Sequence, residues 1–366
     1  MVAALFAVTF AIANPLAAFG VFLPVLAEAF GWSRGAISVA LSINLLVGGV
    51  VGFGIGAVAD RRGPRGVMLA TVLLAGAGYA LASTVSALWH FYLLVGVLVG
   101  VGFSSIYVLA AATVARWFEH GRGLALGIVL TGMNLGYVTG GPGTAFLIET
   151  VGWRTTYVVL GLEVAVVGGL ASLFVRFPPG DAGSRARATD PAPPPRGMRL
   201  REALAGRRFW LFAASWFLLG VIFAMVTVHI VAYARDRGLG LAQASLAMTA
   251  YGVGAVGGRL FFGATADRFG ARMTARWCFG GQVAALVLVL AGAPPWALLP
   301  LLVVFGLAFA GADTIYVKAV PESFGLAALG AIMGVLGLGW RAGAALGPAL
   351  AGFVYDATGS YLVPFA

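Results

Sequence analysis

The stretch GAVADRRGPR at residues 56–65 returns almost unchanged at residues 263–272, where the chain reads GATADRFGAR. The two copies are 207 positions apart, and a Gly-Pro pair follows nearly the same spacing, at residues 141–142 and 347–348, 206 positions apart. Two unrelated motifs that recur at nearly one offset indicate that the chain contains a duplicated unit. Internal symmetry of this kind is typical of membrane transporters.

The composition indicates a protein of the lipid bilayer. Of the 366 residues, 61% are hydrophobic and 10% are charged, and the mean hydropathy is +0.97. Soluble domains carry about 25% charged residues, whereas an apolar helix of about 20 residues crosses a bilayer. Such stretches recur along nearly the whole chain. They predict an all-α membrane protein with eleven spans, at residues 4–27, 36–59, 66–87, 91–115, 123–148, 155–175, 209–233, 243–266, 275–293, 297–320 and 327–354.

One long polar stretch divides the spans into two groups. Residues 176–208 are rich in proline and arginine, which predicts a disordered cytoplasmic linker that ends in a short basic helix. The predicted domains are an N-terminal six-helix bundle over residues 1–175, the linker, and a C-terminal bundle over residues 209–366. The C-terminal bundle is expected to hold five helices and the start of a sixth.

The loop charges predict the orientation in the membrane. Cytoplasmic loops carry an excess of arginine and lysine. With the N-terminus and the linker inside, seventeen of the 23 basic residues lie on the cytoplasmic side and four lie outside. The basic residues are arginines except for Lys318, a bias that fits a GC-rich bacterial genome. We expect a multi-pass protein of a bacterial inner membrane with a cytoplasmic N-terminus.

Other classes of function find little support. The net charge of +10 would suggest nucleic acid as a partner of a soluble protein, but the membrane accounts for it here. Cys278 is the only cysteine and the three histidines are scattered, so we expect no disulfide, no metal and no cofactor. A G-x-G-x-x-G pattern at residues 252–257 lacks the preceding strand and the following amphipathic helix of a dinucleotide-binding turn. No nucleophile or phosphate loop points to an enzyme.

The duplicated motif resembles that of a known family. G-x-x-x-D-R-x-G-x-R after the second span, repeated after the eighth, is similar to the signature loop of the major facilitator superfamily. More narrowly, residues 19–38, 122–136 and 258–270 resemble the monocarboxylate transporters and the oxalate/formate antiporters. This resemblance implies two pseudo-symmetric six-helix halves that move a small organic anion by alternating access. The sequence stops at SYLVPFA, where the twelfth helix of the family would begin, so we expect that helix to be missing from this chain.

Several mechanisms are compatible with this resemblance. We expect a secondary active transporter that moves a monocarboxylate by proton symport. Anion exchange of the oxalate/formate type is the second interpretation, because two buried arginines could hold a dianion. A carrier for a neutral solute or a drug is the third, and a transport-inactive truncated protein or sensor is the alternative from another class. The expected partners are the organic anion, protons and the bilayer, and the expected state is a monomer.

The resemblance also implies a conformational latch at the two signature loops. In the family, carboxylates of these loops contact a neighbouring helix N-terminus or an arginine, and the contacts are remade as the halves rock. Ordinary interfacial charge is the alternative, but repetition at one offset favours a latch. The predicted latch residues are Gly56, Asp60, Arg61, Gly63, Arg65, Arg116, Gly263, Asp267, Arg268, Gly270 and Arg272.

Arg259 is a charge placed deep within a span. It precedes Asp267 by eight residues, so it lies about 12 Å inside a hydrocarbon core about 30 Å thick. A charge at this depth costs at least about 2.5–3.5 kcal/mol and needs a partner or a water-filled cavity. In the resembling families, an arginine four residues before the glycine of this loop binds the substrate carboxylate, and Arg259 has that spacing to Gly263. A structural ion pair is the alternative. By the same resemblance, Arg341 in the eleventh span corresponds to a second basic residue of the oxalate/formate antiporters.

Asp313 is the candidate for proton coupling. It lies about 10 Å deep in the tenth span, which matches the depth of Arg259. The animal monocarboxylate carriers place an aspartate one turn before the arginine, where this chain has Ala255. We therefore hypothesise that Asp313 pairs with Arg259 in the empty protein, and that its protonation frees the guanidinium for a substrate carboxylate.

Five further polar residues lie in apolar surroundings. Tyr107, Asn14 and Asn134 are the remaining candidates for contacts with the substrate. Glu163 lies midway along the sixth span, where we expect a packing or neutral role. His229 lies near the outer end of the seventh span, where it could titrate near neutral pH or be an interfacial histidine without a function.

Overall fold

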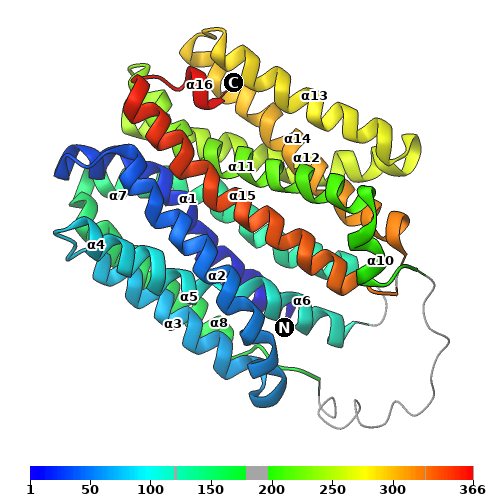
Figure 1. Cartoon of the computed structure of the whole chain (residues 1–366). Coiled ribbons are helices and arrows are strands. Elements are labelled where there is room, and N and C mark those ends of the chain that lie inside the picture. Colours follow the sequence, from blue (N-terminus) through cyan, green and yellow to red (C-terminus); the bar gives the residue numbers. More distant parts are fainter. Residues whose placement is uncertain (119–121, 179–196, 326, 366) are drawn as a thin grey trace.

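The computed structural model describes residues 1–118, 122–178, 197–325 and 327–365. Within these ranges the chain is helical, apart from loops and one isolated β-bridge between Gly197 and Gly325 (Figure 1). The predicted all-α class is therefore confirmed. Residues 179–196 of the predicted disordered linker lie outside the described residues.

The first half holds the first six predicted spans. The fourth span consists of four consecutive pieces, and the fifth and sixth spans are joined in one long element. The elements are α1 (Val2–Phe30), α2 (Arg34–Arg62), α3 (Pro64–Ala82), α4 (Leu88–Phe91), the π-helix η1 (Tyr92–Leu98), α5 (Val99–Phe103), α6 (Ile106–Trp117), α7 (Arg122–Glu163), the π-helix η2 (Val164–Gly168) and α8 (Gly169–Ser172).

The second half holds the remaining five spans. It begins with a short helix, in agreement with the short helix predicted at the end of the linker, and it ends with a single helical turn. The elements are α10 (Leu200–Ala205), α11 (Arg207–Asp236), α12 (Leu241–Phe269), α13 (Ala271–Leu290), the 3-10 helix η3 (Pro295–Ala297), α14 (Leu298–Phe324), α15 (Leu329–Thr358) and α16 (Leu362–Phe365).

Glycines set the breaks between spans. Within α7 the backbone leaves the helical region at Gly152, with φ 81° and ψ 159°, and this break separates the fifth span from the sixth. The two signature loops turn at Gly63 (φ 82°, ψ 157°) and at Gly270 (φ 82°, ψ 156°). A positive φ favours glycine because it has no Cβ. The duplicated sequence thus forms the same turn in both halves.

Helix lengths agree with a multi-pass membrane protein. In the described part of the chain, nine segments are long and apolar enough to cross a bilayer, and one of them, Ala125–Ser172, contains the two spans on either side of Gly152. α12 is a further helix of 29 residues whose apolar character is diluted by glycines and by Arg259. Together these segments account for the eleven predicted spans.

The two halves touch mainly through three pairs of helices, namely α1 with α11, α2 with α15 and α7 with α12. Figure 1 shows the blue and cyan helices of the first half grouped together, with α15 of the second half beside α2. Several of these contacts leave no room for a Cβ, and two of them serve as examples. A Cβ on Gly20 would lie 2.8 Å from the carbonyl oxygen of Thr227, and one on Gly352 would lie 2.5 Å from Cα of Gly35. Both contacts lie toward the end of the molecule opposite the linker, which we call the far end.

Toward the linker end, the facing helices are less tightly packed. A Cβ on Gly54 of α2 or on Gly337 of α15 would meet no atom within 4 Å. These glycines lie on the linker side of Arg341. A side chain at either position would therefore not clash with the facing helix. The structure is therefore a pair of bundles held tightly at the far end.

Candidate functional site

Four polar side chains from both halves gather midway between the two ends. They are Tyr107 of α6, Arg259 of α12, Asp313 of α14 and Arg341 of α15, and we call them the central site. The hydroxyl of Tyr107 interacts electrostatically with all three charged side chains. The structure thus brings together four of the six residues that the sequence analysis proposed for substrate binding and proton coupling.

Arg259 and Asp313 form an ion pair within the second half. The Nη2 atom of Arg259 lies 3.4 Å from Oδ2 of Asp313, and the two side chains keep 34% and 30% of their surface accessible. Partly accessible charges in the middle of long helices border a space that water can enter. The Nε atom of Arg259 is buried without a hydrogen-bond partner in the described part of the chain. The ion pair therefore leaves part of the hydrogen-bonding capacity of Arg259 unused.

Arg341 crosses from the second half toward the first. Its Cδ and Nη1 atoms lie against α2, 3.4 Å and 3.8 Å from the positions that a Cβ would take on Gly49 and Gly48. The absence of side chains at these two glycines leaves room for the arginine. No ion pair or hydrogen bond of its guanidinium is found within the described residues. A bare cation in the middle of a span needs water or an anionic ligand.

Tyr107 brings the first half to the central site. Tyr107 is the second residue of α6, and 55% of its surface is accessible. A phenol that is accessible midway along a span and close to two guanidinium groups can donate a hydrogen bond to an anion held between the halves.

An aromatic cluster lies between the central site and the far end. Phe223 of α11 contacts Phe309 (ring centroids 4.9 Å apart), Trp340 (5.6 Å) and Tyr251 (5.9 Å) within the second half. Tyr137 of the first half completes the cluster, with its ring 5.6 Å from that of Tyr251. These large rings meet across the interface between the halves, and Trp340 is next to Arg341 of the central site in the sequence.

The other predicted site residues lie elsewhere. Asn14 donates a hydrogen bond from Nδ2 to Oε1 of Glu163 over 2.8 Å, inside the first half. Asn134 is buried where α7 crosses α12, with its carbonyl oxygen 3.2 Å from the Cβ position of Gly252. Asn14 thus bonds to Glu163 rather than to a charge of the central site, and the predicted contacts of both residues with a substrate stay predictions.

Two of the predicted latch residues, Arg116 and Asp60, contact each other, and the latch itself stays a prediction. Nη2 of Arg116 lies 2.6 Å from Oδ1 of Asp60, so the end of α6 is tied to the end of α2. The guanidinium of Arg116 also stacks over Phe177 at 3.7 Å, where the linker begins. Together with Gly56 these residues line a pocket of about 270 Å³ at the linker end. The side chain of Asp267, the second loop's equivalent, lies outside the described side chains.

A network that the sequence analysis did not anticipate ties the halves at the far end. Arg34 of α2 bonds to Asp236 of α11 through two parallel contacts, Nη1 to Oδ2 at 2.6 Å and Nη2 to Oδ1 at 2.7 Å. Asp356 of α15 accepts hydrogen bonds from the backbone N–H groups of Arg34 (3.0 Å) and Gly35 (2.8 Å). Glu28 and Arg235 add an ion pair of 2.9 Å. We call this network the far-end lock.

His229 extends the lock into the protein. It is fully buried between the two halves, a position that the sequence did not indicate. Its Nε2 atom lies 2.8 Å from the carbonyl oxygen of Pro348, which can only accept, so Nε2 carries the proton. Its Nδ1 atom then accepts from the hydroxyl of Tyr361 at 3.0 Å, and that hydroxyl accepts from Nη1 of Arg34 at 3.0 Å. Burial raises the pKa of Tyr361, which keeps this donor protonated.

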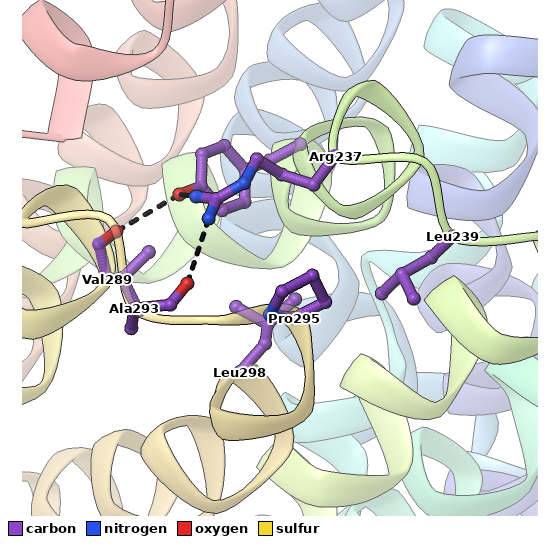
Figure 2. Close-up of a pocket in the computed structure, with 7 residues that line it drawn as sticks. Arg237, Leu239, Val289, Ala293, Pro295 and Leu298 are labelled. Atoms are coloured by element: carbon purple, nitrogen blue, oxygen red, sulfur yellow. Dashed lines mark hydrogen bonds between the residues drawn. The ribbon is translucent and has the colours of Figure 1, made fainter.

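Arg237 shows the contrasting case of an arginine that acts within one half. Its guanidinium donates to the hydroxyl of Tyr233 (2.6 Å) and to the carbonyl oxygen of Ala293 (2.9 Å), and Figure 2 shows the second of these bonds. Tyr233 in turn donates to the carbonyl oxygen of Val289 over 3.1 Å. These bonds fix the loop between α13 and α14, and they involve no residue of the first half.

These two arginines allow a matched test of the far-end lock. Arg34→Gln removes the side-chain bonds of Arg34 to Asp236 and Tyr361, and we expect it to shift the equilibrium about tenfold toward a state open at the far end, as the loss of about 1.4 kcal/mol would. Arg237→Gln removes the same charge at the same end and is expected to leave that equilibrium unchanged. Spin labels at Thr150→Cys and Gln243→Cys, exposed residues of opposite halves, report the distance across the far end. Equal distance distributions in both variants would contradict this assignment.

Comparison with known proteins agrees with the geometry. A model of the Major Facilitator Superfamily matches residues 5–247 and 230–366. The chain belongs to this superfamily. Monocarboxylate transporter 11 of Homo sapiens is 31% identical over 323 residues, which cover 84% of this chain and 66% of the relative, just under two thirds of its length. Its counterpart in Mus musculus is 28% identical over 99% of this chain and 82% of the relative. Monocarboxylate transporter 13 of Bos taurus is 26% identical over 96% of this chain and 81% of the relative.

Solved structures show the same fold for this major facilitator. The nucleoside transporter NupG matches with a TM-score of 0.80 at 12% sequence identity, over 100% of this chain and 95% of the other. A bacterial homologue of the human lysosomal transporter Spinster, in an inward-facing and occupied conformation, matches with a TM-score of 0.77 at 17% identity, over 97% and 81%. The expected family and fold are confirmed, and the chain is a transporter rather than an enzyme.

Proposed function

We propose that this major facilitator carries a small monocarboxylate together with a proton, and that the central site holds both. The observation that carries the proposal is the guanidinium of Arg341, which lies midway along a span without an ionic partner among the described residues. The similarity to proteins named monocarboxylate transporters supports this substrate class.

In this proposal, the two arginines have different tasks. Arg341 anchors the carboxylate, because guanidinium groups bind carboxylates through two parallel hydrogen bonds. Tyr107 donates a further hydrogen bond from the opposite half. The sequence analysis placed Arg259 first, whereas the ion pair with Asp313 makes Arg259 the residue that responds to protonation.

Asp313 is the proposed proton acceptor. While it is ionised, it neutralises Arg259, and the central site carries one uncompensated positive charge. When Asp313 takes up a proton, Arg259 is released and can join Arg341 at the substrate. The bound anion stabilises the released guanidinium, so proton and anion load together. The halves then exchange their tight contacts at the far end for contacts at the linker end.

Anion exchange is the second candidate, and it rests on the same two arginines. With Asp313 protonated, the central site carries two positive charges and can hold a dianion. The two mechanisms differ in what drives uptake: an inward proton gradient drives symport, whereas an anion preloaded inside drives exchange.

The loop charges support the orientation proposed from the sequence. The linker and both signature loops carry most of the arginines, so we place the linker end in the cytoplasm and the far end outside, in a bacterial inner membrane. The structure, held tightly at the far end, then corresponds to a state that opens toward the cytoplasm.

Uptake into liposomes tests the proposal. Purified protein is reconstituted and supplied with labelled lactate, pyruvate, formate or oxalate, with and without an inward proton gradient, beside protein-free liposomes. We expect at least one monocarboxylate to accumulate at least tenfold faster with the gradient. Uptake that requires oxalate or formate preloaded inside would favour exchange. No uptake of any acid by folded protein would overturn an organic-anion function.

A further inference from the structure

A basic and aromatic patch lies on the second half, away from the central site. Three arginines, Arg268, Arg272 and Arg276, line the end of α12 and the first two turns of α13, and all three are exposed. Within the described residues they form no ion pair. Figure 1 shows α13 along the outer edge of the second half, with its first turns near the linker end. We call these arginines, with Phe269 and Trp277, the α13 patch.

The aromatic members of the patch are ordered against one another. The rings of Phe269 and Trp277 meet edge to face at 5.4 Å, and the guanidinium of Arg268 lies 5.3 Å from the ring of Phe269. Phe269 is nevertheless 51% exposed and Trp277 42% exposed. Tryptophan beside arginine at the end of a span is typical of the boundary between headgroups and acyl chains.

The apolar side of the patch continues along a face that meets lipid in both halves. Met273, Trp277 and Leu288 form an exposed stripe on α13. The equivalent residues of the first half, 207 positions earlier, are Gly66, Ala70 and Leu81 of α3, and they are exposed as well. Because the first half leaves this face of α3 uncovered, we infer that the stripe on α13 faces acyl chains rather than another helix.

The first half lacks the aromatic pair and the third arginine that lie at the polar end of the α13 patch. At the same offset, Phe269 corresponds to Arg62, Arg276 to Leu69 and Trp277 to Ala70. The signature loop itself therefore does not require an aromatic pair or a third arginine. The α13 patch is an addition confined to the second half.

We propose that the α13 patch binds one anionic phospholipid. The phosphate headgroup lies among the three guanidinium groups, and the glycerol and upper acyl chain lie against Trp277 and the stripe below it. Charge complementarity carries the choice of lipid, since three arginines that form no ion pair with any described side chain favour an anionic headgroup over a zwitterionic one by about fivefold for each arginine. The proposal does not depend on which solute is transported.

Titration of the detergent-purified chain with lipid, read by native mass spectrometry, tests this proposal. Phosphatidylglycerol and phosphatidylcholine of equal chain length are the probes. We expect one phosphatidylglycerol to bind at least tenfold more tightly than phosphatidylcholine, and Arg276→Gln to weaken it about fivefold. Arg62→Gln removes the same charge from the other signature loop and is the matched control, expected to leave this site unchanged.

Two further variants separate a site from general attraction or misfolding. Arg276→Lys keeps the charge and is expected to retain most of the binding, and Trp277→Ala is expected to weaken both lipids. Equal binding of the two lipids, or an equal loss in Arg276→Gln and Arg62→Gln, would overturn the proposal. Loss of binding in Arg276→Lys together with a lowered melting temperature would also overturn it, because the arginine would then serve the fold.

Discussion

Replacing Arg341 by glutamine is expected to weaken carboxylate binding about a hundredfold and to abolish measurable uptake at low substrate concentration. A bidentate bond between a guanidinium and a carboxylate, in a site partly shielded from water, contributes roughly 3 kcal/mol, and each 1.4 kcal/mol changes affinity tenfold. Arg341→Lys keeps the charge but cannot form two parallel hydrogen bonds to the carboxylate, so we expect the binding affinity to fall by an intermediate factor of about ten. Equilibrium binding of labelled substrate to the purified protein measures these differences directly.

A neutral double variant serves as the control for this prediction. Arg259→Gln combined with Asp313→Asn removes the ion pair without changing the net charge of the central site. If Arg341 is the anchor, the double variant should bind the anion within a few-fold of the unmodified protein. Normal binding by Arg341→Gln, together with lost binding in the double variant, would show that Arg259 holds the carboxylate instead.

Asp313→Asn is expected to uncouple transport from the proton gradient. The asparagine leaves Arg259 without an ionised partner at every pH, so the step that requires a proton is bypassed. In the unmodified protein we expect an inward gradient to stimulate uptake at least tenfold, and in the variant we expect this stimulation to be lost. The rate of exchange of internal for external substrate should stay within a few-fold of the rate in the unmodified protein. The two rates are measured in the same liposomes, with and without the gradient.

The opposite result would be equally informative. If Asp313→Asn still responds fully to the gradient, the carboxylate is a structural partner of Arg259 and the proton is taken up elsewhere. A melting temperature for each variant, measured in the same detergent, distinguishes loss of coupling from loss of the fold. Arg237→Gln, which acts only within the second half, is the control for removing an arginine.

The far-end lock shows why some of the functional residues escaped the sequence analysis. Arg34, Asp236 and Asp356 each lie at the end of a span, where charged residues are common and carry no distinctive spacing. Their significance comes from the three helix ends that meet in space, at separations along the chain that no local pattern encodes. A count of acidic residues at the outer ends of spans gives Glu28, Glu149, Asp236 and Asp356 as candidates, and only the structure shows which of them meet Arg34.

The sequence alone predicts the features that follow from local chemistry. Apolar runs of sufficient length form spans because an unpaired backbone is too costly in lipid, and the repeated loop predicts two similar halves that each turn at a glycine. The depth of Arg259 and Asp313 follows from helical rise. Each of these depends only on neighbours within a few turns.

Only the tertiary structure decides which charges are neutralised. It pairs Arg259 with Asp313, leaves Arg341 against two glycines of the opposite half, turns Asn14 toward Glu163 and buries His229. The reason is physical: the cost of a charge in the membrane depends on what surrounds it. Here those surroundings come from helices brought together by packing between residues distant in the sequence.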